Sequence, residues 1–224
     1  MTTKRNLCIA MLSIVVFLSC DFKVSVNLKT PSNQAEVKQV NENLSFPMET
    51  GFTKEFLQAN FWKCNYNSAG EALAYWVILP NNMKPVRIEP TQVEETNLLN
   101  IGRYERIDTS PYLEVWVLTE TLTENVEPAE WLRNWLKTAN ETIIHEKEIV
   151  GSNGNKYLDV LTSKSTSTND TSISRCTVYR SELSSANGET MWNYFFIKVS
   201  CGINDYEKLA KTIQHISSNW GVKY

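Results

Sequence analysis

The feature that most constrains the fold is a pair of alternating segments joined by a turn-forming dipeptide. Residues 173–183 and 191–201 flank Asn187-Gly188, which favours the two positive φ angles of a type I′ turn. One side of the second segment is apolar and should be buried. That side is formed by Phe195, Ile197, Val199 and Cys201. The pattern predicts an antiparallel hairpin with one buried face.

Other segments have strand patterning. Residues 112–122 alternate and are rich in β-branched and aromatic side chains, and residues 75–79 form a hydrophobic run that Pro80 ends. Residues 142–150 and 156–163 are predicted as two further strands around a Gly-Ser-Asn-Gly turn. Pro85 and Pro90 bracket another short extended piece, residues 94–100 form a less regular connection, and we interpret residues 164–172 as an exposed loop.

Helical patterning occurs in three places. Residues 53–61 favour a short amphipathic helix, Pro128 opens a second helix, and a third runs from Asp205 to about Trp220. We expect Asn204 to cap the third helix, with Glu207 as its capping-box partner. The apolar stripes of the two longer helices consist of Trp131, Leu132, Trp135 and Leu136, and of Tyr206, Leu209, Ala210, Ile213 and Ile216.

Strands outnumber helices and short turns join them, so the predicted class is α+β, an antiparallel β-sheet flanked by helices. Residues 46–224 contain enough chain for one well-packed domain and too little for two. We therefore expect a single α+β domain at 46–224.

The first residues have the layout of a secretory signal. Lys4 and Arg5 precede an apolar run at 7–18 that only Ser13 interrupts. The run is too short to cross a bilayer as a permanent helix. We interpret residues 1–19 as a signal peptide that is removed on export.

The end of this leader resembles the lipobox of bacterial lipoproteins. The box is Phe17-Leu18-Ser19-Cys20, with Phe17 where Leu is usual. The resemblance implies cleavage before Cys20, lipid such as palmitate on that cysteine, and attachment to the periplasmic face of the inner or outer membrane. Asp21 resembles the inner-membrane retention signal of enteric lipoproteins. The alternative is an ordinary signal peptide cleaved nearby, with Cys20 as an unmodified thiol.

Residues 20–45 are polar and lack any hydrophobic period, so we interpret them as a flexible tether between the lipid and the domain. The formal charge of −3 becomes −5 once Lys4 and Arg5 are removed with the leader. A mildly acidic protein lacks the basic surface that nucleic acids require. We therefore expect no nucleic-acid partner.

Cys64, Cys176 and Cys201 remain in the folded part of the chain. Reflection about Asn187-Gly188 places Cys201 opposite Ser174, one diagonal step from Cys176, so a Cys176–Cys201 disulfide is a candidate. A bridge from Cys64 to either one, or two buried thiols, are the alternatives. Neither a redox motif nor metal-ligand spacing is present.

The order of these elements resembles the PsbP-like superfamily, which includes small bacterial lipoproteins of DcrB type. It comprises the strand ending in Leu79-Pro80, the strand at 112–122, the helix opening Pro128-Ala129-Glu130-Trp131-Leu132, meandering strands, and a helix ending near Trp220. The similarity covers roughly residues 70–222. It implies an α/β/α sandwich and a role in binding or assembly, in some members beside secretion machinery, and it implies no catalytic residues.

No catalytic motif accompanies the two histidines, His145 and His215. We expect Glu94, Glu95 and Asp108 to be solvated loop charges. A calcium-binding site is not predicted, because the ligand spacing of an EF-hand is absent. The candidate calcium ligands would be Asp159, Asn169, Asp170 and Glu182. The sequence thus predicts a non-enzymatic protein without metal or cofactor.

The tryptophans bear on binding. We assign Trp131 and Trp135 to the core, whereas Trp62, Trp116 and Trp192 are candidate ligand-contact aromatics. Our leading hypothesis is an envelope lipoprotein that binds a protein partner or supports assembly of an envelope complex. The alternatives are a lipoprotein that binds a small ligand or glycan through exposed aromatics, and an unrecognised hydrolase. A pocket lined by exposed tryptophans would favour the ligand, and a flat apolar patch would favour the protein.

Overall fold

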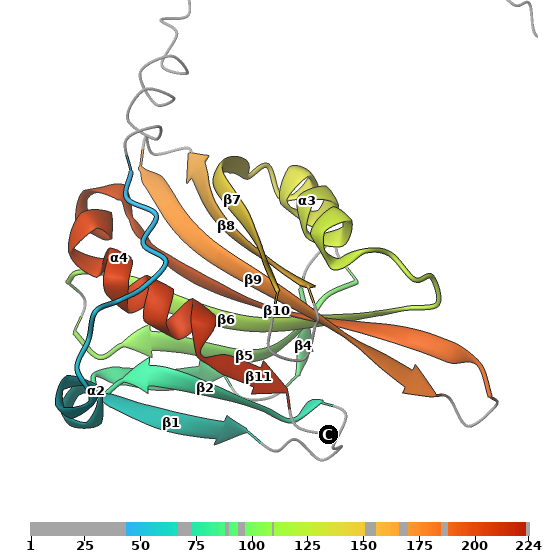
Figure 1. The fold of residues 1–224 in the computed structure, drawn as a ribbon, viewed down its shortest axis with the longest axis horizontal. Coiled ribbons are helices and arrows are strands. Elements are labelled where there is room, and N and C mark those ends of the chain that lie inside the picture. The colour runs from blue at the N-terminus through green and yellow to red at the C-terminus, as the bar shows by residue number, and fades with distance from the viewer. Residues whose placement is uncertain are drawn as a thin grey trace, which may run out of the picture.

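The structure is a computed structural model that describes residues 44–66, 73–87, 90–93, 97–108, 110–150, 156–165, 170–184 and 188–222. The leader, Cys20 and nearly all of the predicted tether lie outside these residues. Within them the chain forms helices and two antiparallel sheets (Figure 1).

The larger sheet has eight strands in the order β3-β5-β6-β10-β9-β8-β7, with β4 beside β5. The smaller sheet has the order β1-β2-β11. The large sheet consists of β3 (Met83–Arg87), β4 (Thr91–Gln92), β5 (Leu99–Arg106), β6 (Leu113–Leu122), β7 (Thr142–Val150), β8 (Lys156–Ser165), β9 (Thr171–Ser184) and β10 (Thr190–Gly202). The small sheet consists of β1 (Phe61–Tyr66), β2 (Tyr75–Pro80) and β11 (Trp220–Val222). The helices are α2 (Lys54–Asn60), α3 (Pro128–Thr138) and α4 (Ile203–Ser218).

The large sheet is the middle layer. Figure 1 shows α3 on one of its faces and α4, with the small sheet, on the other. This arrangement confirms the predicted class, an α+β fold with an antiparallel sheet flanked by helices.

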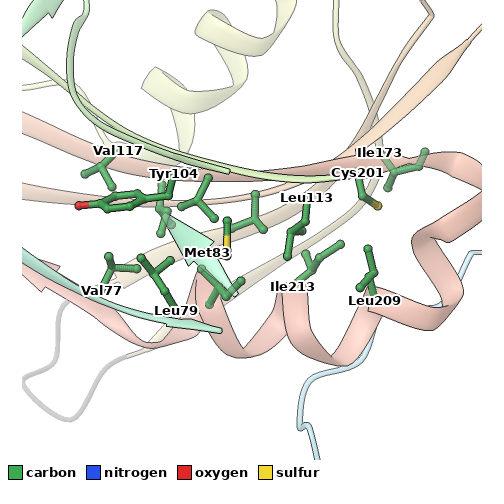
Figure 2. Packing of buried hydrophobic residues seen from close by; sticks show 14 of the residues in the cluster. Val77, Leu79, Met83, Tyr104, Leu113, Val117, Ile173, Cys201, Leu209 and Ile213 are labelled. Atoms are coloured by element: carbon green, nitrogen blue, oxygen red, sulfur yellow. The ribbon is translucent and has the colours of Figure 1, made fainter. Parts of the chain in front are cut away.

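Each face of the large sheet has its own hydrophobic core. On the α4 face, Ile213 of α4 lies beside Leu113 of β6, and Val77 and Leu79 of β2 belong to the same cluster (Figure 2). On the α3 face, Trp131, Leu132 and Leu136 pack against β8, β9 and β10. The stripes predicted for both helices are therefore the surfaces that hold the three layers together.

The N-terminal cap of α4 differs from the prediction. Gly202 is the N-cap residue and makes no side-chain hydrogen bond, while Asn204 lies inside the helix. Glu207 accepts instead from the main-chain N–H of Ser45, at 2.9 Å. The predicted capping box is wrong because a distant segment, not the helix's own first turn, occupies the Glu207 carboxylate.

Strand β5 is absent from the sequence prediction, which left residues 94–100 irregular and the following residues unassigned. A bulge between Asn100 and Gly102 breaks the alternation, so that Ile101 and Tyr104 both contribute to the α4-face core. The predicted loop at 164–172 is also too long, because β8 continues to Ser165 and β9 begins at Thr171.

The hairpin register overturns the candidate disulfide. Cys201 lies opposite Ile173, one residue from the predicted partner Ser174, and Cys176 lies opposite Lys198. Because a one-residue shift moves a side chain to the other face, Cys201 enters the α4-face core and Cys176 the α3-face core. The sheet separates the two thiols, and Cys64, Cys176 and Cys201 are all free.

We predict that these buried thiols do not react in the native protein. Burial raises the pKa of the Cys176 thiol, and it raises the pKa of the Cys201 thiol to about 12, so little thiolate is present at pH 8. Iodoacetamide should label neither cysteine before unfolding. After unfolding without reductant it should label Cys64, Cys176 and Cys201, and an intact mass showing only one labelled thiol among them would contradict the structure.

Gly102 marks the closest approach within the core. Tyr75 Oη lies 2.6 Å from Tyr104 Oη, and a Cβ added at Gly102 would lie 1.8 Å from Tyr75 Oη. The Tyr75 side chain is fully buried and cannot move aside without disturbing its hydrogen-bond partners.

We predict that Gly102→Ala destabilises the protein by about 2–3 kcal/mol through this overlap, as overpacking does. Gly202→Ala is the matched control, because a Cβ there meets no atom within 4 Å. Urea unfolding of both variants measures the difference. Equal stabilities would show that the Tyr75 hydroxyl does not press against the β5 main chain.

Candidate binding groove

A groove of about 350 Å³ opens between α2, the turn after β2 and α4. We call it the α2–α4 groove. It is lined by Phe56, Asn60, Phe61, Pro80, Asn81, Asn82, Arg106, Leu113, Leu209 and Thr212. The lining joins an apolar wall to a rim of amides and one guanidinium.

Helix α2 is placed by contacts at both of its ends. Thr53 caps its start, since the Thr53 hydroxyl accepts from the Phe56 N–H at 3.2 Å. At the other end Asn81 donates its main-chain N–H to Asn60 O and its amide to Ala59 O, both at 2.8 Å. Because these bonds satisfy carbonyls that a helix end leaves free, the turn after β2 and α2 hold each other in position.

An aromatic cluster supports the groove from behind. The Phe52 ring packs against Phe56 with centroids 4.7 Å apart, and the Phe61 ring meets His215 of α4 edge-on at 4.8 Å. Phe56 is 43% exposed, whereas His215 is buried. The groove thus carries one exposed aromatic side chain, Phe56, and the rings of Phe56 and Phe61 are packed against Phe52 and His215.

Arg106 is the only ionisable residue that lines the groove. Its Nη1 donates to Pro111 O at 3.1 Å, and with the Asn82 amide oriented to satisfy both groups, Nη2 donates to Asn82 Oδ1 at 2.7 Å. Asp108, which we predicted to be a solvated loop charge, lies 4.0 Å from the guanidinium. Since proton transfer needs an acid or base that titrates, this lining suits binding.

The structure does not bring the three candidate tryptophans together. Trp62 is 36% exposed on β1, and its indole N–H donates to Pro80 O. Trp116 and Trp192 lie on the α3 face, where Trp192 pairs with Leu122. Six residues separate Leu122 from Trp116, which is about 20 Å along a strand. None of the three lines the α2–α4 groove.

Arginines cover the rings of two of these tryptophans. Arg103 lies 4.8 Å from the Trp116 ring centroid, and Arg180 lies 4.8 Å from that of Trp192. Both indoles also pack partly into the α3-face core. They therefore act as structural cation–π partners, while Trp131 and Trp135 pack in or against that core, as predicted.

The residues considered as calcium ligands do not lie together in the structure. Asp159 is fully buried and paired with Arg175, while Asp170 and Glu182 lie near opposite ends of β9. Asn169, like Glu94 and Glu95, lies outside the described residues. Among the residues that the structure describes, no cluster of three or more His, Cys, Asp or Glu could hold a metal ion.

Sequence patterns gave little indication of this groove. Pro80-Asn81-Asn82 was recognised only as a strand terminator, and Arg106 lies in the unpredicted strand β5. The groove assembles residues from α2, β1, β2, β5, β6 and α4, so no local signal could reveal it. No helix in the described part of the chain is long and apolar enough to span a membrane.

Comparison with known proteins adds a likeness to solved structures. Neither a scan against protein-family models nor a search of curated proteins gives a match. Among solved structures, the chain is similar to LpqN of Mycobacterium tuberculosis, described as involved in cell envelope biogenesis. The TM-score is 0.43 and the identity 10%, over 77% of this chain and 98% of that chain. At these values neither membership of the PsbP-like superfamily nor a function follows, and both stay predictions.

We predict that the buried His215 makes the stability of the protein sensitive to acid. Burial lowers the pKa of His215, so the unfolded chain, with a histidine pKa of about 6.5, takes up a proton before the folded chain does. The free energy of unfolding should therefore fall as the pH drops from 7.5 to 5.5. His215→Gln should reduce this slope in urea titrations, and an unchanged slope would assign the acid sensitivity to other groups.

Proposed function

We propose that the protein is a lipid-anchored, non-enzymatic component of the bacterial cell envelope that binds a segment of a protein partner in the α2–α4 groove. The proposed location in the cell envelope is supported by the leader and by the lipobox-like Phe17-Leu18-Ser19-Cys20. The binding role rests on the groove. Support of an envelope complex, beside secretion machinery or elsewhere, is the role that such binding would serve.

The observation that carries the binding role is the composition of the groove. Phe56, Phe61 and Pro80 supply apolar surface above the buried Leu113 and Leu209. The only ionisable lining residue, Arg106, is already held by Asn82 and Pro111. Burying one large apolar side chain there would contribute about 1.5–3 kcal/mol. The groove therefore suits one or two anchor side chains, with further affinity coming from contacts around it.

Two features favour a polypeptide over a glycan. The tryptophans that could stack on sugar rings lie elsewhere, two of them beneath arginines. The rim carries the amides of Asn60 and Asn81, whose nitrogens donate to main-chain carbonyls of α2. Each amide also has an oxygen that can accept from a peptide N–H. The volume also lies within the range of small-ligand sites, so a small apolar ligand is the second candidate.

We predict that the groove variant Phe56→Ser loses its partner. Membrane crosslinking followed by pulldown of the wild-type chain should recover a specific envelope complex, and Phe56→Ser should reduce that recovery about tenfold, which corresponds to roughly 1.4 kcal/mol. Val150→Ser is the matched control, because Val150 is 64% exposed on β7, away from the groove. Equal recovery from both variants would exclude the groove as the binding site.

We predict that Cys20→Ala releases the protein from membranes. The intact mass of wild-type protein from native membranes should match residues 20–224 plus lipid, because acyl chains on one cysteine give stable attachment without a spanning helix. The variant should fractionate as soluble protein. Cleavage at another site without lipid would make this a free exported protein and would favour the small-ligand candidate.

A further inference from the structure

The first described residues, Leu44 to Met48, lie against the α4 face of the large sheet without forming helix or strand. We call them the strap. In Figure 1 they are the start of the blue segment that passes beside α4. The strap contacts α4 and also β7 and β9 of the large sheet. Leu44 and Phe46 pack against the core on this face.

Side chains of the domain bind the main chain of the strap. Tyr206 Oη donates to Ser45 O at 2.5 Å, Arg175 Nη1 to Pro47 O at 2.6 Å, and Gln214 Nε2 to Met48 O at 2.9 Å. His145 Nε2 lies 3.2 Å from Leu44 O. Among the described residues, no main-chain group of the domain hydrogen-bonds to the strap. The strap is thus held as an extended peptide ligand would be, by side chains that recognise successive carbonyls.

Two contacts select side chains of the strap. Ser45 donates both its main-chain N–H and its hydroxyl to Glu207, at 2.9 and 2.5 Å. The Phe46 ring lies between the Arg175 guanidinium, 4.4 Å from its centroid, and the His145 ring at 5.6 Å. Pro47 has no N–H that would need a partner in this setting. These contacts define a Ser-aromatic-Pro sequence.

The connection after the strap is lightly packed. Gly51 adopts a φ of +65°, and a Cβ added there would meet no atom within 4 Å. The main chain at Gly51 can therefore change conformation without meeting a neighbour, so the strap can leave its site by rotation at this residue.

We call the surface of α4, β7 and β9 beneath the strap the channel. We propose that the channel is a peptide-binding site for an extended Ser-aromatic-Pro segment. In this structure the chain's own residues 44–48 fill it, and the same segment of a second copy fills it when the chain's own strap is displaced. Attachment gives the strap an effective concentration in the millimolar range. A free peptide therefore competes poorly with it until the strap is weakened. The inference depends neither on the α2–α4 groove nor on lipid at Cys20.

The test uses the full chain and a synthetic peptide of residues 43–50. Phe46→Ala weakens the strap in cis but leaves Arg175, Glu207 and the other channel side chains in place. The fluorescent peptide should bind this variant about tenfold more tightly than it binds the wild type, where the attached strap competes. It should also raise the melting temperature of the variant, and a peptide with Ala in place of Phe46 should do neither.

A second variant guards against failure of Phe46→Ala to fold. Ser45→Ala removes only the hydroxyl bond to Glu207 and should give the same order of peptide affinities with a smaller difference. Saturable binding that is lost with the Ala peptide supports the proposal. No saturable binding to either variant, or equal binding of the two peptides, would overturn it and make the strap a fixed part of the core. Because neither Phe56 nor Cys20 is altered, this outcome is independent of the partner experiments.

Discussion

The ion pair between Arg175 and Asp159 constrains the α4 face of this protein most strongly. Both side chains are fully buried, and two hydrogen bonds of 2.8 and 2.5 Å join them. Removing one partner of such a pair costs about 3–5 kcal/mol, because the other charge stays buried and unpaired. The pair therefore fixes β8 against β9, and Pro47 O is the third acceptor that the guanidinium needs. The segment that occupies the site at Pro47 therefore completes the hydrogen bonding of a buried charge.

Strand β10 gives the fold its two faces. It pairs with β6 on one side and β9 on the other, and its buried apolar residues alternate between the two cores. Phe195 and Ile197 face α4, whereas Tyr194 and Phe196 face α3. This division explains why Cys176 and Cys201 are inert small side chains in separate cores. The α2–α4 groove lies at the edge of the α4-face core, which contributes Leu113 and Leu209 to its lining.

The α2–α4 groove and the strap channel suit different kinds of recognition. The groove offers apolar surface at its edge and one ionisable side chain that is already engaged, so it suits anchor residues of a partner. The channel offers buried donors, which bind main-chain carbonyls, and the exposed Glu207 carboxylate, which accepts from Ser45. Both lie on the α4 side of the large sheet, and α4 contributes to each, through Leu209 and through Tyr206.

The sequence alone determined the elements whose period is unbroken: the stripes of α3 and α4, strand β6, and the β9–β10 hairpin. Such patterns suffice because a helix or strand buries one side at a fixed spacing. The tertiary structure decided the hairpin register, the bulged strand β5, the Arg175–Asp159 pair and the α2–α4 groove. Each of these depends on contacts between residues far apart in the chain, as between Pro47 and Arg175. The sequence of one segment does not determine which distant residues will share its buried space, so no local pattern predicts these contacts.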